Sequence, residues 1–284
     1  MGAEKKQTYS IKGLEFDKPT HKYTYQGEKL VGSISSISAI ANGDSFGMAS
    51  SWASKVVSQE MAALVLDNMG AIVDPYGHTP EEVTGLAEQA RNKPNEIRDS
   101  SADFGTKLHK YVEEVCNGND PPLPDTYASF GSKLNDEEKL RKACVALKLF
   151  VQKHIQPVAS EVRLILKTST KRFCVPGTAD LICQIKNGAP SEYFVLDWKG
   201  VTGGSLNRPL KKSFFVQLEA YRHSVIQNFD LNCVGFIICR IDRDSAEIKP
   251  EIHRPRDHSL IDAFNACAEI YRLKKPKTEL LKGE

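Results

Sequence analysis

The sequence predicts an α/β protein (α+β) with a central mixed β-sheet flanked by helices, and three observations predict it. From about residue 45 to residue 157, apolar residues recur mostly at helical spacing. After Pro157 the pattern changes to short apolar runs of strand length, separated by turn signals. An amphipathic stretch at 213–228 interrupts these strands and another closes the chain. The predicted order is therefore helix, three strands, helix, strand, strand and helix.

We expect one domain, 1–284, in four parts. Residues 21–38 are rich in Tyr, Thr, Ile and Ser around a QGE turn, which predicts a hairpin in an N-terminal part, 1–44. The other three parts are a helical region, 45–157, the strand-rich core, 158–254, and the C-terminal helix, 255–284.

Two helices of the middle region have clear limits. The first carries an apolar stripe at helical spacing and ends at Asn117-Gly118, a typical stop signal. The stripe consists of Phe104, Leu108, Tyr111, Val112 and Val115. The second helix begins at Asn135, which can cap it together with Glu138 three residues on, and Pro157 marks its end.

The strand-rich core begins with three strands at 160–167, 173–185 and 192–200, joined by turns. They predict a three-stranded meander. A fourth strand follows at 233–241, and Pro250 restricts the last strand to a sheet edge because proline lacks the N–H that an inner strand must donate.

Composition favours an intracellular, soluble protein. The 284 residues carry a formal net charge of +2, so any nucleic-acid partner must be held by local rather than global positive charge. Seven cysteines without a CxxC pair argue against zinc ribbons and thioredoxin-type sites and favour a reducing compartment. We expect no signal peptide and no transmembrane segment, and therefore no membrane partner.

Two acidic residues and a lysine lie in neighbouring core strands, Asp180 at the middle of the second and Asp197 and Lys199 near the end of the third. Asp180 follows GTA in the second strand, and Asp197 and Lys199 lie two apart in FVLDWKG, so they share a face of the third. Two neighbouring carboxylates repel unless a divalent cation separates them, and Mg²⁺ (or Mn²⁺) suits such an oxygen-rich site. The backbone carbonyl of Trp198 is a further candidate ligand, and its ring should pack on the other face. The alternative is a simple Asp–Lys ion pair.

With these residues in place, the chain resembles the PD-(D/E)XK nuclease superfamily. GTAD and LDWKG are similar to its central motif, GTKLH to the GxxxH element of the RecB-like and phage-type exonuclease branch, and VQLEAY to its QxxxY element. The matching motifs span roughly residues 101–241, in the family's order. The residue before Asp180 is Ala179 where the family name has proline. The resemblance implies a restriction-endonuclease-like core within 158–254.

The resemblance also implies roles for individual residues. Asp180, Asp197 and His109 would hold the metal, and Lys199 would position and activate the attacking water. Gln217 and Tyr221 share a helix face and would assist at the catalytic site. Further acidic candidates are Glu113, which shares a helix face with His109, and Glu161, at the start of the first strand. A structural His, a surface Glu and a Tyr at the edge of the core are the ordinary alternatives.

Local basic clusters are the candidates for nucleic-acid contacts, because phosphates need positive partners. They comprise Lys171, Arg172, Arg208, Lys211, Lys212 and Arg240. Phe214 and Phe215 follow directly and could stack on unpaired bases, or simply pack. We expect no iron–sulfur cluster, since Cys233, Cys239 and Cys267 are far apart and lie within apolar elements.

The sequence thus predicts a Mg²⁺- or Mn²⁺-dependent deoxyribonuclease whose partner is single-stranded DNA or duplex ends. By analogy with related exonucleases, whose helical additions thread a strand, we favour an exonuclease. The alternatives are a structure-specific or restriction-like endonuclease and, in a different class, a non-catalytic nucleic-acid-binding protein. The last has no use for a metal-activated water, which argues against it.

Overall fold

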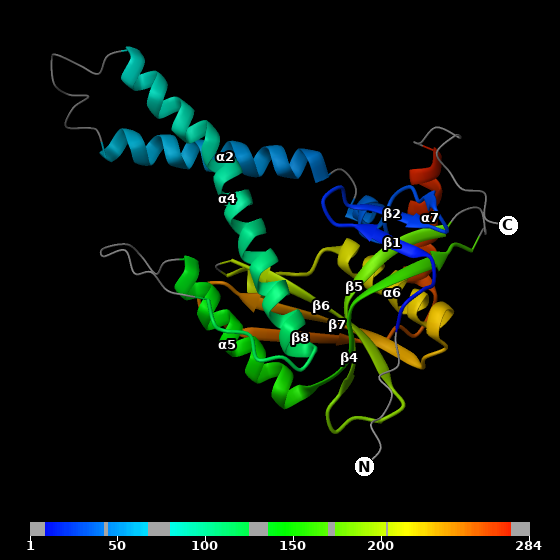
Figure 1. Cartoon of the computed structure of the whole chain (residues 1–284). Helices are drawn as coiled ribbons and strands as arrows, with labels where there is room; N and C mark the ends of the chain where they lie inside the picture. Colours follow the sequence, from blue (N-terminus) through cyan, green and yellow to red (C-terminus); the bar gives the residue numbers. More distant parts are fainter. Residues whose placement is uncertain are drawn as a thin grey trace. The chain divides into compact units, whose positions relative to one another are not determined.

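The computed structural model describes residues 9–42, 45–67, 80–124, 136–169, 174–202 and 204–273 (Figure 1). The chain forms two compact units, one of Met1–Asn42 with Lys107–Glu284 and the other of Gly43–Thr106. The expected helical region 45–157 is thus divided, and its second part belongs to the unit that contains the central sheet.

The central sheet has five strands in the order β4-β5-β6-β7-β8 (Figure 1). The strands are β4 Ile155–Lys167, β5 Cys174–Ile185, β6 Tyr193–Val201, β7 Cys233–Asp242 and β8 Ile248–His253. β4, β5 and β6 form an antiparallel meander, β6 pairs in parallel with β7, and β8 returns antiparallel. The mixed sheet is confirmed, and β8, which contains Pro250, lies at its edge as predicted.

The helices also follow the predicted order. They are α1 Ile34–Ser38, α2 Ser45–Asp67, α4 Pro80–Cys116, α5 Asp136–His154, α6 Lys212–Phe229 and α7 Ser259–Leu273, with short 3₁₀ turns η1 Ala39–Asn42 and η2 Ser205–Asn207. α4 continues through Pro94 and stops as predicted at Asn117-Gly118, where Gly118 takes φ +85°. α6 is the crossover that parallel pairing of β6 and β7 requires.

One helix end was predicted wrongly. α5 ends at His154 and β4 begins at the next residue, so Pro157 lies inside a strand rather than at the end of the helix. β4 tolerates it because the β4–β5 register shifts between Pro157 and Ala159, which interrupts the ladder where proline has no N–H to donate.

The sheet carries helices on both faces. One face, with Val195 and Ile238, joins buried residues of α1, α6 and α7 in a single core. Trp198 points to the other face, where its ring lies edge-on to Phe150 of α5, with centroids 6.4 Å apart. The packing role predicted for the Trp198 ring is therefore confirmed, and Asp197 and Lys199 face α6 because successive residues of a strand alternate.

The N-terminal part forms a small antiparallel sheet, β1 Leu14–Asp17, β2 Lys22–Tyr25 and β3 Glu28–Lys29. The hairpin around Gln26 and Gly27 is confirmed. Residues 34–38 were expected to belong to it but form α1 instead. Ser33 and Ser36 make a reciprocal capping box, and Ile34 and Ile37 are fully buried, so capping and burial outweigh the strand propensity of this segment.

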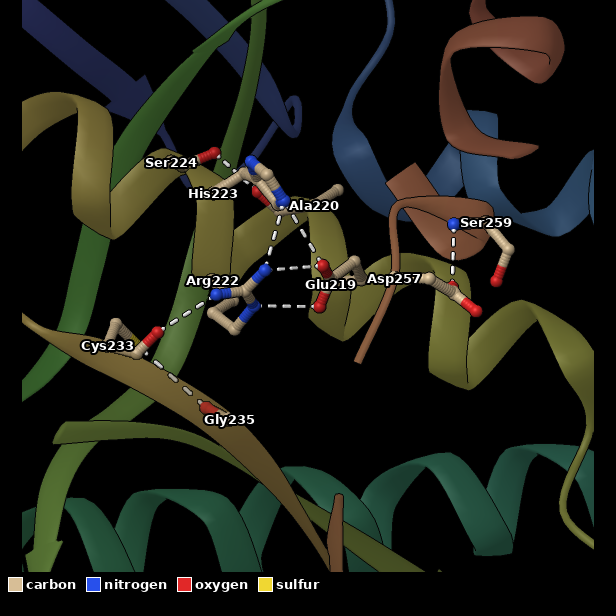
Figure 2. Close-up of polar contacts among 9 residues, drawn as sticks. All are labelled: Glu219, Ala220, Arg222, His223, Ser224, Cys233, Gly235, Asp257 and Ser259. Atoms are coloured by element: carbon tan, nitrogen blue, oxygen red, sulfur yellow. Dashed lines mark hydrogen bonds and ion pairs between the residues drawn. The ribbon is translucent and has the colours of Figure 1, made fainter. Parts of the chain in front are cut away.

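Helix α6 is fixed to the sheet by a buried ion pair (Figure 2). Glu219 is completely buried and accepts hydrogen bonds from Arg222 Nη2 at 2.7 Å and Nε at 2.8 Å. His223 Nε2 lies 3.1 Å from the same carboxylate, and Arg222 Nη1 donates to the Cys233 carbonyl at the start of β7. These contacts set the position of α6 along the sheet.

The second unit consists of α2 and the first part of α4. Lys93 of α4 lies 3.8 Å from Glu60 of α2, a partly exposed ion pair that contributes little stability. Across the described part of the chain, every helix is too short or too polar to pass through a lipid bilayer.

Candidate metal centre

Three acidic residues lie in a row across β4, β5 and β6. The last ladder pair of β5 and β6 is Leu181 with Leu196, so the next step along the strands places Asp180 opposite Asp197. The β4–β5 register places Glu161 opposite Asp180 on its other side. Glu161 adopts φ +49°, which a non-glycine residue rarely does, so the backbone of β4 bends at this point.

The pairing of β5 with β6 stops at Asp180. The β5–β6 ladder ends at Leu181, and beyond it the backbone N–H of Trp198 donates to Asp180 Oδ2 at 3.0 Å instead of to a strand carbonyl. The carboxylate thus satisfies a backbone donor and opens the sheet. This hydrogen bond fixes the orientation of Asp180 without using all of its oxygen lone pairs.

His109, near the C-terminal end of α4, completes the site from above the strands. Its Nε2 lies 3.0 Å from the Trp198 carbonyl oxygen, which can only accept, so Nε2 carries the hydrogen. In the neutral ring Nδ1 then has the lone pair, and it lies 3.5 Å from Asp180 Oδ2. Two acceptors face each other across this gap, an arrangement that a proton or a cation between them stabilises.

The donor set fits a divalent cation. One ligand atom from each of His109, Glu161 and Asp180 lies within 4.8 Å of the others, close to the separation of about 4.2 Å between opposite oxygens around Mg²⁺. Asp197 is 4% exposed, and its Oδ2 makes no hydrogen bond. That oxygen lies 2.7 Å from Lys199 Nζ in an ion pair, and a cation near this row would be a second partner for it. The sequence placed Asp197 with His109 and Asp180, whereas the compact triad has Glu161 in that position.

Burial and crowding raise the pKa values of two of these carboxyls. Burial raises the pKa of Asp197 to about 6, although Lys199 opposes the shift. Burial, with the nearby charges of Asp180 and Glu113, raises the pKa of Glu161 to about 7. Burial is the larger cause of both shifts, and the neighbouring carboxylates add to it, so a bound cation would be stabilised at this site.

Lys199 forms the cationic side of the site. Its Nζ lies 2.9 Å from Asp197 Oδ1 and 2.7 Å from Oδ2, but only the first contact has hydrogen-bond geometry. Nζ also sits 5.1 Å from the centre of the Phe214 ring on α6, a cation–π contact. Burial lowers the pKa of Lys199, but Asp197 and Asp180 outweigh it and raise the pKa overall, so the ammonium stays protonated.

Gln217 and Tyr221 of α6 lie over the same face of the sheet. The Gln217 amide donates to the Tyr221 hydroxyl at 3.5 Å, the long end of hydrogen-bond range. Tyr221 is buried, and burial raises the pKa of its phenol strongly, so it stays neutral. The charges of Asp180 and Asp197 act on it as well, which places the phenol near the acidic row.

The remaining candidates lie at varying distances from this centre. Glu113 acts on Glu161 through charge but is not a member of the compact triad. Arg208, Lys211 and Lys212 are exposed. Lys171 and Arg172 lie outside the described residues. Each of these residues remains a prediction.

Arg240 requires a correction. We expected it to bind phosphate, but it is 3% exposed and donates to the backbone carbonyls of Ser205 and Arg208 while pairing with Glu251. The expectation rested on the position of Arg240 in the fourth strand, and that position does not show that a distant loop covers it.

Three features near the centre were not predicted. Tyr23 of β2 shares a hydrogen bond of 2.9 Å with Thr178 of β5, and the charge of Lys18 acts on Glu161, so the N-terminal sheet lies close to the acidic row. Phe214 lies against Lys199. Only Phe214 had a signal, its position just after the basic cluster. The others depend on packing between distant segments.

Comparison with known proteins adds little. No family model matches the chain, and neither does any curated protein. Among solved structures, one described as "Crystal structure of SSO0001" has 18% sequence identity over 70% of this chain and 72% of that one, with a TM-score of 0.37. Such a likeness supports no conclusion about function.

Proposed function

We propose that this protein is a metal-dependent nuclease of the PD-(D/E)XK type that hydrolyses phosphodiester bonds in DNA. The observation that carries the proposal is the compact triad of His109, Glu161 and Asp180 beside the buried pair of Asp197 and Lys199. Glu161, Asp180 and Asp197 lie side by side across three strands, and a divalent cation would stabilise such a group more than the single ammonium of Lys199 does.

Mg²⁺ or Mn²⁺ would be held by His109 Nδ1 and by carboxylate oxygens of Glu161 and Asp180, with Asp197 adjacent. Trp198 also has a free lone pair on its carbonyl oxygen, since His109 uses one. When bound, the cation lowers the pKa of coordinated water and offsets the negative charge of the phosphate. The donor set of one imidazole and several carboxylates suits either ion.

Lys199 would orient the attacking water or a phosphate oxygen. An ammonium has three N–H donors, and Asp197 takes one of them in a hydrogen bond. A further donor is then free to point toward the substrate. As a protonated group, Lys199 would stabilise negative charge that develops on the phosphate oxygens and would not act as a base.

The flanking residues would hold the nucleic acid. Gln217 can donate to a phosphate or a base with its second amide hydrogen. The first amide hydrogen is donated to the Tyr221 hydroxyl, which orients the Gln217 side chain. Arg208, Lys211 and Lys212 offer exposed positive charge to the backbone. We assign the substrate contacts to Arg208, Lys211 and Lys212 because they come directly after β6, the strand that carries Lys199.

We further propose an exonuclease that acts on ends or single strands, which rests on the family resemblance, and an intracellular location. All seven cysteines are free, and five of them are buried, as in proteins of reducing compartments. A structure-specific or restriction-like endonuclease would use the same centre, so the site itself does not separate the two.

End-labelled linear DNA and internally labelled circular DNA, each in single- and double-stranded form, would test the proposal with Mg²⁺, Mn²⁺ or excess EDTA. We expect cleavage of linear DNA that requires the metal ion, and no cleavage of circular DNA. Equal cleavage of circles would favour the endonuclease. Activity undiminished in EDTA, or no cleavage of any DNA in either metal, would overturn the nuclease proposal. A matched RNA strand tests the choice of DNA.

A further inference from the structure

The segment that joins β6 to α6, residues 204–211, carries two of the exposed basic residues, Arg208 and Lys211. It contains the η2 turn, and Arg208 follows it in an extended conformation, φ −73° and ψ 151°. Although the segment lies at the surface, its Leu206 side chain is buried. The backbone is therefore tied down while the basic side chains face outward.

The segment 204–211 is attached to the sheet by two members of a row of three cationic residues, one on each of β6, β7 and β8. Lys199 is the register partner of Arg240, and Arg240 is the partner of Lys249. Neighbours in register point to the same face of a sheet and lie about 4.8 Å apart along the row. The first member belongs to the candidate centre, and the other two reach the segment.

Arg240 holds the segment by its backbone. Its Nη1 donates to the Arg208 carbonyl at 2.7 Å and to the Ser205 carbonyl at 3.4 Å, while Nη2 pairs with Glu251 of β8. With 3% exposure, the guanidinium is sealed from solvent. The planar fork reaches two carbonyls with one nitrogen and a carboxylate with another in a fixed geometry, whereas a lysine offers a single nitrogen.

Lys249 provides a second, exposed anchor. Its Nζ donates to Asn207 Oδ1 at 2.8 Å, between the two residues that Arg240 holds. The segment is thus fixed at three successive positions after Ser205, by the buried Leu206, by Lys249 and by Arg240. The strand that supplies Arg240 pairs directly with the strand that supplies Lys199.

We infer that Arg240 is a positioning residue for substrate binding: it holds the Arg208 backbone so that the Arg208 side chain meets a DNA phosphate beside Lys199. This inference rests on the proposed function. Arg240 itself does not touch the substrate, and Glu251 keeps its charge paired. Loss of Arg240 should therefore weaken the binding of DNA while the chemical step remains intact.

A double-mutant cycle on a single-stranded DNA substrate tests this inference. Arg208→Ala should raise KM and the Kd in EDTA about tenfold, as loss of a charged hydrogen bond does, and should lower the salt slope of binding by about one ion. Arg240→Gln should raise KM by a similar factor with kcat within about twofold. The double variant should bind no more weakly than Arg208→Ala alone, since both act through one contact.

Matched controls guard against a general loss of structure. Arg254→Gln removes an exposed arginine that pairs with Glu192 instead of with the segment, and it should leave KM within about twofold of wild type. If Arg240→Gln does not fold, Asn207→Ala removes the exposed anchor and should raise KM in the same direction by a smaller factor. Arg240→Lys should keep the defect because it loses the fork.

The outcomes separate the two proposals. If the wild type fails to cleave DNA, the proposed function fails, and binding in EDTA still measures the coupling of Arg240 and Arg208. If the wild type cleaves but Arg240→Gln and Asn207→Ala bind like wild type, the inference alone is overturned. Additive losses in the double variant, or a fall in kcat at constant KM, also contradict it.

Discussion

The backbone N–H of Trp198 donates to Asp180 Oδ2 at 3.0 Å, at the point where the β5–β6 ladder stops. A carboxylate here does two things. It accepts a hydrogen bond from the Trp198 N–H, which has no strand carbonyl as a partner once the ladder ends. Its remaining lone pairs lie on the side of His109 and Glu161. The structural role of Asp180 and its proposed metal-binding role are therefore separable by substitution.

Asp180→Asn should separate them. The amide oxygen still accepts from Trp198, so the melting temperature should stay within about 3 °C of wild type. Loss of the charge should weaken Mn²⁺ binding at least about tenfold. Calorimetry, or the electron paramagnetic resonance signal of free Mn²⁺, measures this change. Asp180→Ala is the control, because it removes the acceptor too and should lower the melting temperature further. Unchanged Mn²⁺ affinity in Asp180→Asn would remove this residue from the metal site.

Glu161→Gln should stabilise the metal-free protein at pH 8. The folded-state pKa of Glu161 is raised to about 7, so its contribution to stability is present below the unfolded value near 4.5 and is lost as the pH rises through 7. The neutral amide avoids the repulsion from Asp180 and Glu113. Melting curves at pH 5.5 and pH 8 should show a gain mainly at pH 8.

Mn²⁺ should reverse this order, because a ligand of the folded state adds stability by mass action. With saturating Mn²⁺ at pH 8, the wild type should gain more in melting temperature than Glu161→Gln. An equal gain in both proteins would show that Glu161 lies outside the coordination sphere.

Gly177 lies under Tyr221, where a side chain does not fit. A Cβ at this position would lie 2.6 Å from the Tyr221 ring and 3.0 Å from Ile34. Gly177→Ala should therefore destabilise the protein by about 1–3 kcal/mol and displace the phenol. Gly105→Ala is the matched control: its Cβ would meet nothing within 4 Å in helix α4, so it should be neutral or stabilising. Urea denaturation compares the two.

The central fold was predictable because its signals are local. Pro250 marked an edge strand and Asn117-Gly118 marked the end of α4, each through the chemistry of one or two residues. The errors arose where tertiary packing determined the secondary structure. Ile34 and Ile37 read as strand residues, yet their burial against α6 and α7 made a helix. Pro157 read as a helix stop, although a register shift admits it into β4.

The candidate site shows the same limit. Asp197 and Lys199 could be proposed from strand alternation, since spacing along one strand fixes a face, and Asp180 from the neighbouring strand of the predicted meander. Glu161 was only a weak candidate, because its place opposite Asp180 depends on the pairing of β4 with β5 and on an unusual φ. Arg240 was assigned to the wrong surroundings because a sequence does not show which loop covers a strand residue.

The ion pair of Glu219 and Arg222 should make the fold acid-sensitive (Figure 2). Burial alone would raise the pKa of Glu219, but hydrogen bonds from Arg222 and His223 outweigh it and lower the pKa. The stabilisation is therefore present above pH 4.5 and is lost as the pH falls through the folded-state value. Glu219→Gln should cost about 3 kcal/mol at pH 7 and less at pH 3.5.

Glu269→Gln provides the comparison for Glu219→Gln. Glu269 forms the same i, i+3 contact with Arg272 in α7, but both side chains are about one quarter exposed. Its loss should cost less than about 1 kcal/mol. Equal losses at the two sites, measured by urea denaturation, would contradict a special role for the buried pair.

The most direct test of the central claim measures the release of labelled nucleotides from single-stranded DNA by wild type and Lys199→Ala in Mn²⁺, with Mn²⁺ binding followed in parallel. We predict cleavage by the wild type that EDTA abolishes, and a loss of at least about 100-fold in Lys199→Ala while Mn²⁺ still binds. Full activity of Lys199→Ala would contradict the account.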